Sequence, residues 1–220
     1  MKTSLRLATA AILAAGALSA TAPAHAVGAA APCTDAVTLA EFARIGSCQN
    51  GDKQYTYVSS DFGGFDTTQV SLQFAFFDSL GKEIHNFSVD PVPVAQDGTY
   101  LLNYTIEILD PKKIFLAVDI ESDVTVDPVQ FVKNVDGDGD LGNGLVGTLT
   151  SLNGTPVAAL DIAGLGLTKL WIYETVTVGP GGAVNAFSDI YIQGVVPEPG
   201  SLALLGLGLV GLGLGRRRKG

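Results

Sequence analysis

The alternation of apolar and polar residues through the middle of the chain is the feature that most constrains its fold. Three long stretches have an apolar residue at every second position and mostly polar or small residues between: 70–76, 100–108 and 114–121. A period of two places one face of each segment on a core and the other in water, as in antiparallel sheets. Shorter candidate strands, separated by turn signals, cover residues 54–59, 83–89, 124–132, 145–152, 169–178 and 184–192.

About eight to ten such strands without a long helix predict an all-β fold, a two-layer antiparallel β-sandwich with jelly-roll-like connectivity. Pro91, Pro93 and Pro128 are expected to protect sheet edges. One short N-terminal helix is expected before the strands, because Thr38-Leu39-Ala40-Glu41 has the form of a capping box and Gly46 provides a helix stop.

The N-terminal segment 1–26 has the features of a secretory signal peptide. Lys2 and Arg6 precede an apolar stretch, and Pro23-Ala24-His25-Ala26 supplies a cleavage site with small residues. We therefore expect signal peptidase to cleave after Ala26 during export.

The two cysteines, Cys33 and Cys48, are expected to form a disulfide, because export places them in an oxidising compartment. A metal or redox pair is not favoured, since the spacing is not C-x-x-C and no histidine is near.

The part between the two ends of the chain is strongly acidic. Two of 13 basic residues lie in the signal segment and four in the C-terminal tail, which leaves seven. One of 22 acidic residues lies in the tail, so 21 remain and the net charge is −14. This charge argues against nucleic acid or an anionic membrane as a partner of the domain, and is compatible with solubility, divalent cations or neutral polysaccharide.

An acidic, glycine-containing segment resembles part of an EF-hand loop. Asn134, Asp136 and Asp138 fall at positions 1, 3 and 5 of that pattern, and Gly139 falls at the turn position 6. Position 12 is a leucine instead of a bidentate glutamate, and no helices flank the loop. Two interpretations remain open: a Ca²⁺ site at Asn134, Asp136, Asp138 and Asp140, or a hairpin loop between two strands.

Other candidate residues favour structure over chemistry. His85 is the only histidine after signal removal, and a lone histidine is more often structural. Trp171 and Tyr173 lie in a run that is apolar on both faces, which favours a central buried strand over a platform for sugar stacking. No G-x-S-x-G elbow is present, and no two carboxylates are singled out as a glycosidase pair. We therefore predict no catalytic residue and no enzyme activity.

The C-terminal tail combines three features. Val196-Pro197-Glu198-Pro199 comes first, an uncharged apolar run from 201 to 215 follows, and Arg216-Arg217-Arg218-Lys219 forms a basic stop. As a helix the run would span roughly 22 Å, against about 30 Å of hydrocarbon. Its glycines lower helix propensity, so the run suits a temporary anchor better than an ordinary single-pass one, with the basic stop in the cytoplasm.

These features together resemble the PEP-CTERM sorting signal, a tail sometimes labelled an ice-binding-protein C-terminal domain. The resemblance implies a Gram-negative, exopolysaccharide-producing bacterium. It also implies recognition by an exosortase, an integral-membrane protease or transpeptidase that removes the tail. It implies no activity for the remainder of the chain.

The sequence thus predicts a signal peptide (1–26), a β-sandwich passenger domain (27–195) and a sorting signal with a transmembrane helix (196–220). We expect an inner-membrane-anchored precursor, then a cell-surface or matrix protein with a structural, adhesive or matrix-associated role and no cofactor. The alternatives are a Ca²⁺-dependent or carbohydrate-binding module and, after it, a glycan-active enzyme.

Overall fold

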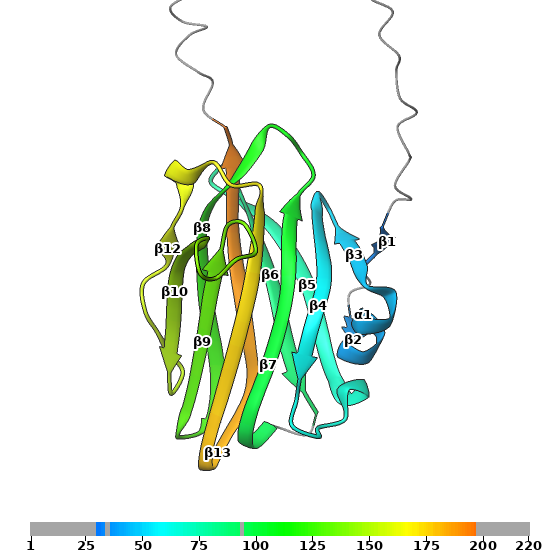
Figure 1. Cartoon of the computed structure of the whole chain (residues 1–220), viewed down its shortest axis with the longest axis vertical. Helices are drawn as coiled ribbons and strands as arrows, with labels where there is room; N and C mark the ends of the chain where they lie inside the picture. Colours follow the sequence, from blue (N-terminus) through cyan, green and yellow to red (C-terminus); the bar gives the residue numbers. More distant parts are fainter. Residues whose placement is uncertain (1–29, 34–35, 93–94, 197–220) are drawn as a thin grey trace, which may run out of the picture.

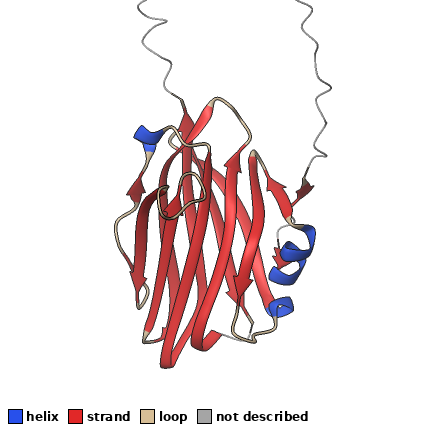
Figure 2. Cartoon of the chain, viewed as in Figure 1, coloured by secondary structure: helices blue, strands red, loops and turns tan. Residues whose placement is uncertain are grey.

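The computed structural model describes residues 30–33, 36–92 and 95–196. The predicted signal peptide and transmembrane segment lie outside these residues. Within them, no helix is long and apolar enough to cross a membrane. Strands make up most of the described chain, and the short helical segments lie at its margins (Figure 2), so the predicted all-β class is confirmed.

The elements follow one another in this order: β1 (Ala31–Pro32), β2 (Ala36–Thr38), α1 (Leu39–Ile45), β3 (Ser47–Asn50), β4 (Lys53–Asp61), η1 (Thr67–Gln69), β5 (Val70–Ser79), β6 (Lys82–Pro91), β7 (Ala95–Ile108), β8 (Lys113–Val126), β9 (Val129–Asp136), β10 (Leu145–Leu152), β11 (Thr155–Pro156), β12 (Leu160–Asp161), η2 (Ala163–Leu165) and β13 (Lys169–Val195).

The long strand β13 joins the two layers of the fold. Its first part, 169–178, lies between β7 and β9. Its second part, 183–195, pairs with β8, and residues 187–193 of this part lie between β6 and β8. The chain runs down one layer, turns at 179–182 and returns up the other layer (Figure 1). A Cβ at Gly182 would lie 2.5 Å from the Pro128 carbonyl oxygen, so this turn requires glycine for close approach.

The core lies between these layers and receives apolar side chains from both. Phe87 on β6 meets Tyr104 on β7 edge to face, with ring centroids 4.8 Å apart. Phe131 on β9 and Phe187 on β13 make a similar contact at 5.2 Å. The fold is therefore sandwich-like, but hydrogen bonding makes it one continuous sheet instead of the two separate sheets of a jelly roll.

The predicted helix forms and covers an open side of the sandwich. The Thr38 hydroxyl accepts a hydrogen bond from the Glu41 amide at 3.2 Å, and Gly46, at φ 76°, ends the helix. Phe42 is fully buried and packs edge to face on Tyr57 of β4 and Phe74 of β5. The helix therefore bridges the two layers where β4 and β5 are not hydrogen-bonded to each other.

Some sequence predictions about strands were wrong. The predicted strand 124–132 is two strands in the structure: β8 ends at Val126 and β9 begins at Val129. The turn between them has a cis peptide bond between Asp127 and Pro128. Pro128 therefore marks a turn and not a sheet edge. Pro91 pairs with Val70 at the end of β6, and Pro93 lies outside the described residues.

The predicted disulfide is confirmed: Cys33 and Cys48 are bonded across a sequence separation of 15. It ties the segment after β1 to β3, beside the parallel pairing of these two strands.

We expect the Cys33→Ser, Cys48→Ser double variant to unfold more easily. Closing a loop of this length stabilises a fold by about 3 kcal/mol in the chain-entropy model. Urea denaturation should show that loss in the free energy of unfolding, and reductant should leave the variant unchanged. An identical midpoint for the variant and the oxidised wild type would contradict this expectation.

Candidate functional site

Three groups of polar side chains stand out within the described residues. The end cluster consists of Asp52, Lys53, Glu83, His85, Lys113 and Gln193. The core cluster consists of Tyr104, Lys133, Glu174, Asp189 and Tyr191. The acidic loop consists of residues 136–144.

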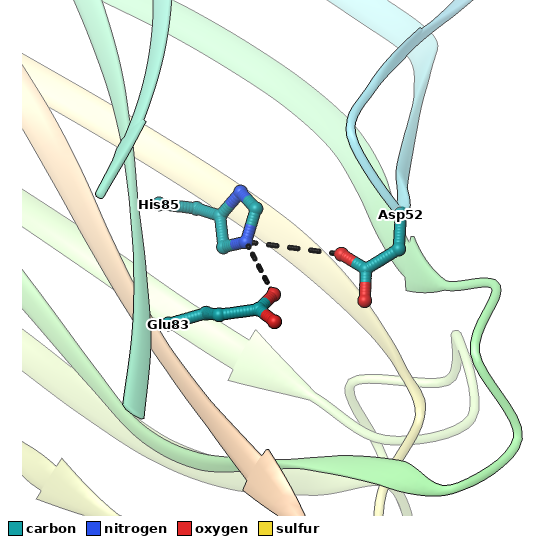
Figure 3. A group of neighbouring side chains, drawn as sticks. All are labelled: Asp52, Glu83 and His85. Carbon is teal, nitrogen blue, oxygen red and sulfur yellow. Dashed lines mark ion pairs between the residues drawn. The ribbon is translucent and has the colours of Figure 1, made fainter. Parts of the chain in front are cut away.

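The end cluster forms where the β3–β4 turn, β6, β8 and the end of β13 meet. His85 points from β6 toward both Asp52 and Glu83 (Figure 3), and its Nε2 lies 3.8 and 3.7 Å from their carboxylate oxygens. Among the described residues, only this trio brings three potential metal-ligating side chains within 4.8 Å of one another. One histidine and two carboxylates are donor types that suit Zn²⁺.

The protein's own cations already occupy these carboxylates. Lys53 pairs with Asp52, and Lys113 pairs with both Glu83 and Asp52, the latter at 3.1 Å. Gln193 donates hydrogen bonds to both carboxylates. Two ammonium groups balance two carboxylates, so the end cluster is neutral without a metal ion.

The pKa values in the end cluster follow from this arrangement. Burial opposes ionisation of Asp52, but hydrogen bonds and charge from Lys53 and Lys113 outweigh it and lower its pKa to about 2. Burial and the charge of Lys53 lower the pKa of His85 to about 4. At neutral pH the histidine is therefore uncharged beside an ionised carboxylate, and neither of its buried ring nitrogens has a hydrogen-bond partner.

The core cluster lies between the layers. Lys133 on β9 pairs with Asp189 on the second part of β13, and both are completely buried. The Tyr104 hydroxyl lies 2.6 Å from that of Tyr191 and also donates to Asp189. Lys133 Nζ is 3.9 Å from Glu174 on the first part of β13. These contacts connect the layers through one charged network.

The surroundings of Glu174 in this network favour its neutral, protonated form. Burial, and then the nearby charge of Asp189, raise the pKa of Glu174 well above its ordinary value. Glu174 Oε1 accepts a hydrogen bond from the Tyr104 hydroxyl at 3.4 Å, whereas its Oε2 has no hydrogen-bond partner. A neutral Glu174 leaves Lys133 with one carboxylate fewer to balance. Perturbed pKa values often mark active sites, but Lys133, Glu174 and Asp189 are at most 1% exposed, so substrate has no access.

The acidic loop connects β9 and β10 and is stabilised by its own backbone. Asp136 accepts hydrogen bonds from the amides of Asp138 and Gly139, and Asp138 accepts one from the Asp140 amide at 2.9 Å. Asn134 lies on β9, where its side chain accepts a hydrogen bond from Thr148. A tight hairpin loop is therefore present at the predicted position, and calcium binding stays a prediction.

Two aromatic side chains lie beneath the acidic loop. Trp171 and Tyr173 are half-buried on the outer face of β13, while Leu170 and Ile172 point inward. A Cβ at Gly139 would lie 2.9 Å from Trp171 Nε1, so the loop contacts the indole closely. The prediction of a central strand is correct, but the prediction that these aromatics lie in the core is wrong.

Sequence reasoning missed both charged clusters. Glu83 and His85 are two residues apart, so they share a strand face. Glu174 also shares a face with Leu170 and Ile172. A polar residue at the same alternate positions as buried apolar residues is a signal in the sequence that this polar residue is buried. Their partners come from strands distant in sequence, and nothing in the pattern identifies those.

The predicted sorting motif begins where the fold ends. Val196 is the last described residue, and its amide donates a hydrogen bond to the Lys112 carbonyl oxygen at 2.7 Å. Pro197, Glu198, Pro199 and the basic stop at Arg216, Arg217, Arg218 and Lys219 lie outside the described residues.

Comparison with protein families agrees with this assignment. A family model described as the PEP-CTERM protein-sorting motif matches residues 195–219. The chain therefore carries a tail that targets an exported protein to exosortase processing. A search of curated proteins finds no match.

We expect Glu174→Gln to be tolerated near neutral pH, whereas Asp189→Asn should cost about 3–5 kcal/mol of stability. The glutamine keeps a neutral donor, whereas the asparagine leaves Lys133 as an unpaired buried charge. Urea denaturation of both variants at pH 7 measures the difference. Equal losses would contradict the preference of Glu174 for its neutral form.

The contribution of Glu174 to the stability of the fold depends on pH. Because the pKa of Glu174 is higher in the folded than in the unfolded chain, the native state binds more protons above the ordinary value of 4.5. Its contribution to stability therefore falls as pH rises from that value toward the folded pKa. Glu174→Gln should remove this part of the pH dependence, and an unchanged profile would contradict the assignment.

Proposed function

We propose that this is a non-enzymatic exported protein, delivered by exosortase sorting to the cell surface or the exopolysaccharide matrix. Its role there is structural, adhesive or matrix-associated. The observation that carries the proposal is the sorting motif at residues 195–219, which starts at the last residue of β13. The sealed state of the core cluster and the lack of a free thiol in the described residues support a non-catalytic role.

The processing route follows from the two ends of the chain. Signal peptidase cleaves after Ala26, and residues 201–215 hold the precursor in the inner membrane with Arg216–Lys219 in the cytoplasm. Exosortase then removes the tail and releases the sandwich toward the surface or matrix of a Gram-negative cell. Release of reducing sugar from the host polysaccharide by the purified protein would contradict the non-enzymatic part.

Replacing Pro197, Glu198 and Pro199 by alanine should block processing, because the motif is what the sorting enzyme reads. Intact mass spectrometry should show a tail-containing protein in the membrane fraction, as it should after deletion of the exosortase gene. The matched control is Pro156→Ala, at an exposed proline of the folded domain. Wild-type processing of the triple variant would contradict the proposal.

The second candidate function is Ca²⁺-dependent or carbohydrate binding at the acidic loop. Asp136 is fully buried, and its Oδ2 has no hydrogen-bond partner. A Cβ at Gly144 would lie 1.9 Å from Asp138 Oδ1 and 2.9 Å from Asp136 Oδ1, so these two carboxylates converge on one side of the loop. Trp171 lies directly below, with Lys169 Nζ 5.1 Å from its ring centroid, so a sugar that stacks on this ring has to displace the lysine.

If this candidate is correct, millimolar Ca²⁺ should raise the melting temperature of the wild type and not of Asp138→Asn. Asparagine preserves the side-chain acceptor for the Asp140 amide and removes one charged ligand. The control is Asp161→Asn, where an aspartate makes the same kind of turn by accepting from the Ala163 amide. No shift in the wild type eliminates the calcium site, and sugar binding unaffected by Trp171→Ala eliminates the aromatic platform.

A further inference from the structure

The end of β13 must lie close to the segment that follows it. Val195 ends the strand, Val196 is hydrogen-bonded to Lys112, and the apolar run begins at Ser201. An extended chain covers at most about 3.3–3.6 Å per residue, so the five steps from Val196 to Ser201 span no more than about 18 Å. If 201–215 is in a bilayer, as the proposed function holds, this end of the sandwich lies beside the membrane surface.

That end carries exposed apolar side chains on several turns. We call it the tail-side end; it includes the β3–β4, β5–β6 and β7–β8 turns and η2, all close to where β13 leaves the fold (Figure 1). Its exposed apolar side chains belong to Phe77, Leu80, Leu109, Leu165 and Val195. Gly81 and Val195 line the same small hollow, so the β5–β6 turn is adjacent to the end of β13.

The turn at Leu80-Gly81 has an unusual residue for its geometry. Both residues have positive φ, 52° and 76°, a combination that favours Asn-Gly. Asn153-Gly154, at the opposite end of the sandwich, adopts the same conformation with φ values of 51° and 79°. Leu80 therefore places a fully exposed leucine where the backbone prefers asparagine. Neither turn formation nor contact with water explains this residue.

The basic residues of the domain are distributed unequally between its two ends. Five of its seven basic residues lie at the tail-side end, where β4, β6, β8 and β13 begin: Lys53, Lys82, Lys112, Lys113 and Lys169. Carboxylates lie toward the same end, at Asp52, Asp78, Glu83, Glu107, Asp110 and Asp161 and in the acidic loop between β9 and β10. The other two are Arg44, paired with Glu41 on α1, and Lys133 in the core. At the opposite end, where β4, β6 and β8 end and β7 begins, the described charged residues are all acidic: Asp61, Asp66, Asp90, Asp97, Asp123 and Asp127.

This distribution changes what the net charge implies. A charge of −14 predicts repulsion from an anionic membrane. Lysines offset part of the negative charge at the tail-side end, whereas the described charged residues at the opposite end are all acidic, so repulsion is weaker when the tail-side end faces the lipid. Lys82 and Lys112 are exposed there, and each basic residue near an anionic surface contributes about 1 kcal/mol of attraction.

We propose that the tail-side end rests on the membrane surface in the precursor, with Leu80 and its apolar neighbours in the headgroup region. The proposal rests on the proposed function, because the anchor supplies the high local concentration that makes weak contacts effective. A few leucines and lysines do not hold a domain on a membrane alone. Removal of the tail therefore releases the domain, and until then the sorting motif stays at the lipid surface.

The test uses the full precursor in vesicles of phosphatidylethanolamine and phosphatidylglycerol. An environment-sensitive fluorophore is attached to the cysteine of Leu80→Cys. The matched control carries it at Asn153→Cys, in a turn of the same conformation at the opposite end. The native disulfide leaves the introduced thiol as the reactive one. We expect a blue shift and quenching by bromine-labelled lipid at position 80, and neither at position 153.

A second variant separates lipid contact from a change in folding. Leu80→Asn introduces the residue that the turn prefers, so it should preserve or raise stability in urea. It should also reduce at least twofold the lipid quenching of a fluorophore at Leu165→Cys, which lies on η2 at the same end. Unchanged quenching in the Leu80→Asn background would overturn the contribution of Leu80.

Vesicle flotation distinguishes failure of this inference from failure of the proposed anchor. A precursor that floats with vesicles but shows no lipid quenching at position 80 would overturn the membrane contact and leave the anchor intact. A blue shift without lipid quenching indicates contact with a second copy of the chain and also overturns it. A precursor that does not float contradicts the anchor, and the membrane contact with it.

Discussion

The hydrogen bonding of β13 to four other strands is the constraint on which the rest of the structure depends. Its first part is central in one layer and its second part is central in the other, so the layers cannot separate without breaking this strand's pairing. The turn at 179–182 fixes the register of both parts. Because β13 is also the last strand, its end determines where the C-terminal tail leaves the domain.

The same strand places two carboxyl groups in the core. Glu174 and Asp189 lie on opposite sides of the turn and meet between the layers, where Lys133 from β9 balances one negative charge. Such a network adds little net stability compared with apolar packing, because desolvation is costly. It does penalise any shift of one layer against the other, since a shift would leave a buried charge unpaired. The end cluster likewise pairs lysines with carboxylates, at the margin of the core.

Local patterns predicted the fold class well, because alternation, caps and turn residues act over a few positions. Thr38 and Gly46 bound the helix as expected, and β10 has the predicted ends. The predictions failed where distant segments decide burial. Trp171 and Tyr173 have apolar neighbours in sequence, yet they lie on the outer face, because Leu170 and Ile172 occupy the inner one.

The sequence alone determined the sorting motif, the disulfide partners and the all-β class, because each depends on residue type, count or short spacing. Only the tertiary structure decided which charges are buried together, since Lys133, Glu174 and Asp189 come from strand segments whose pairing is long-range. It also decided that most lysines gather at the end from which the tail leaves. A net charge sums over the chain, whereas a partner meets one surface, and only folding determines what that surface contains.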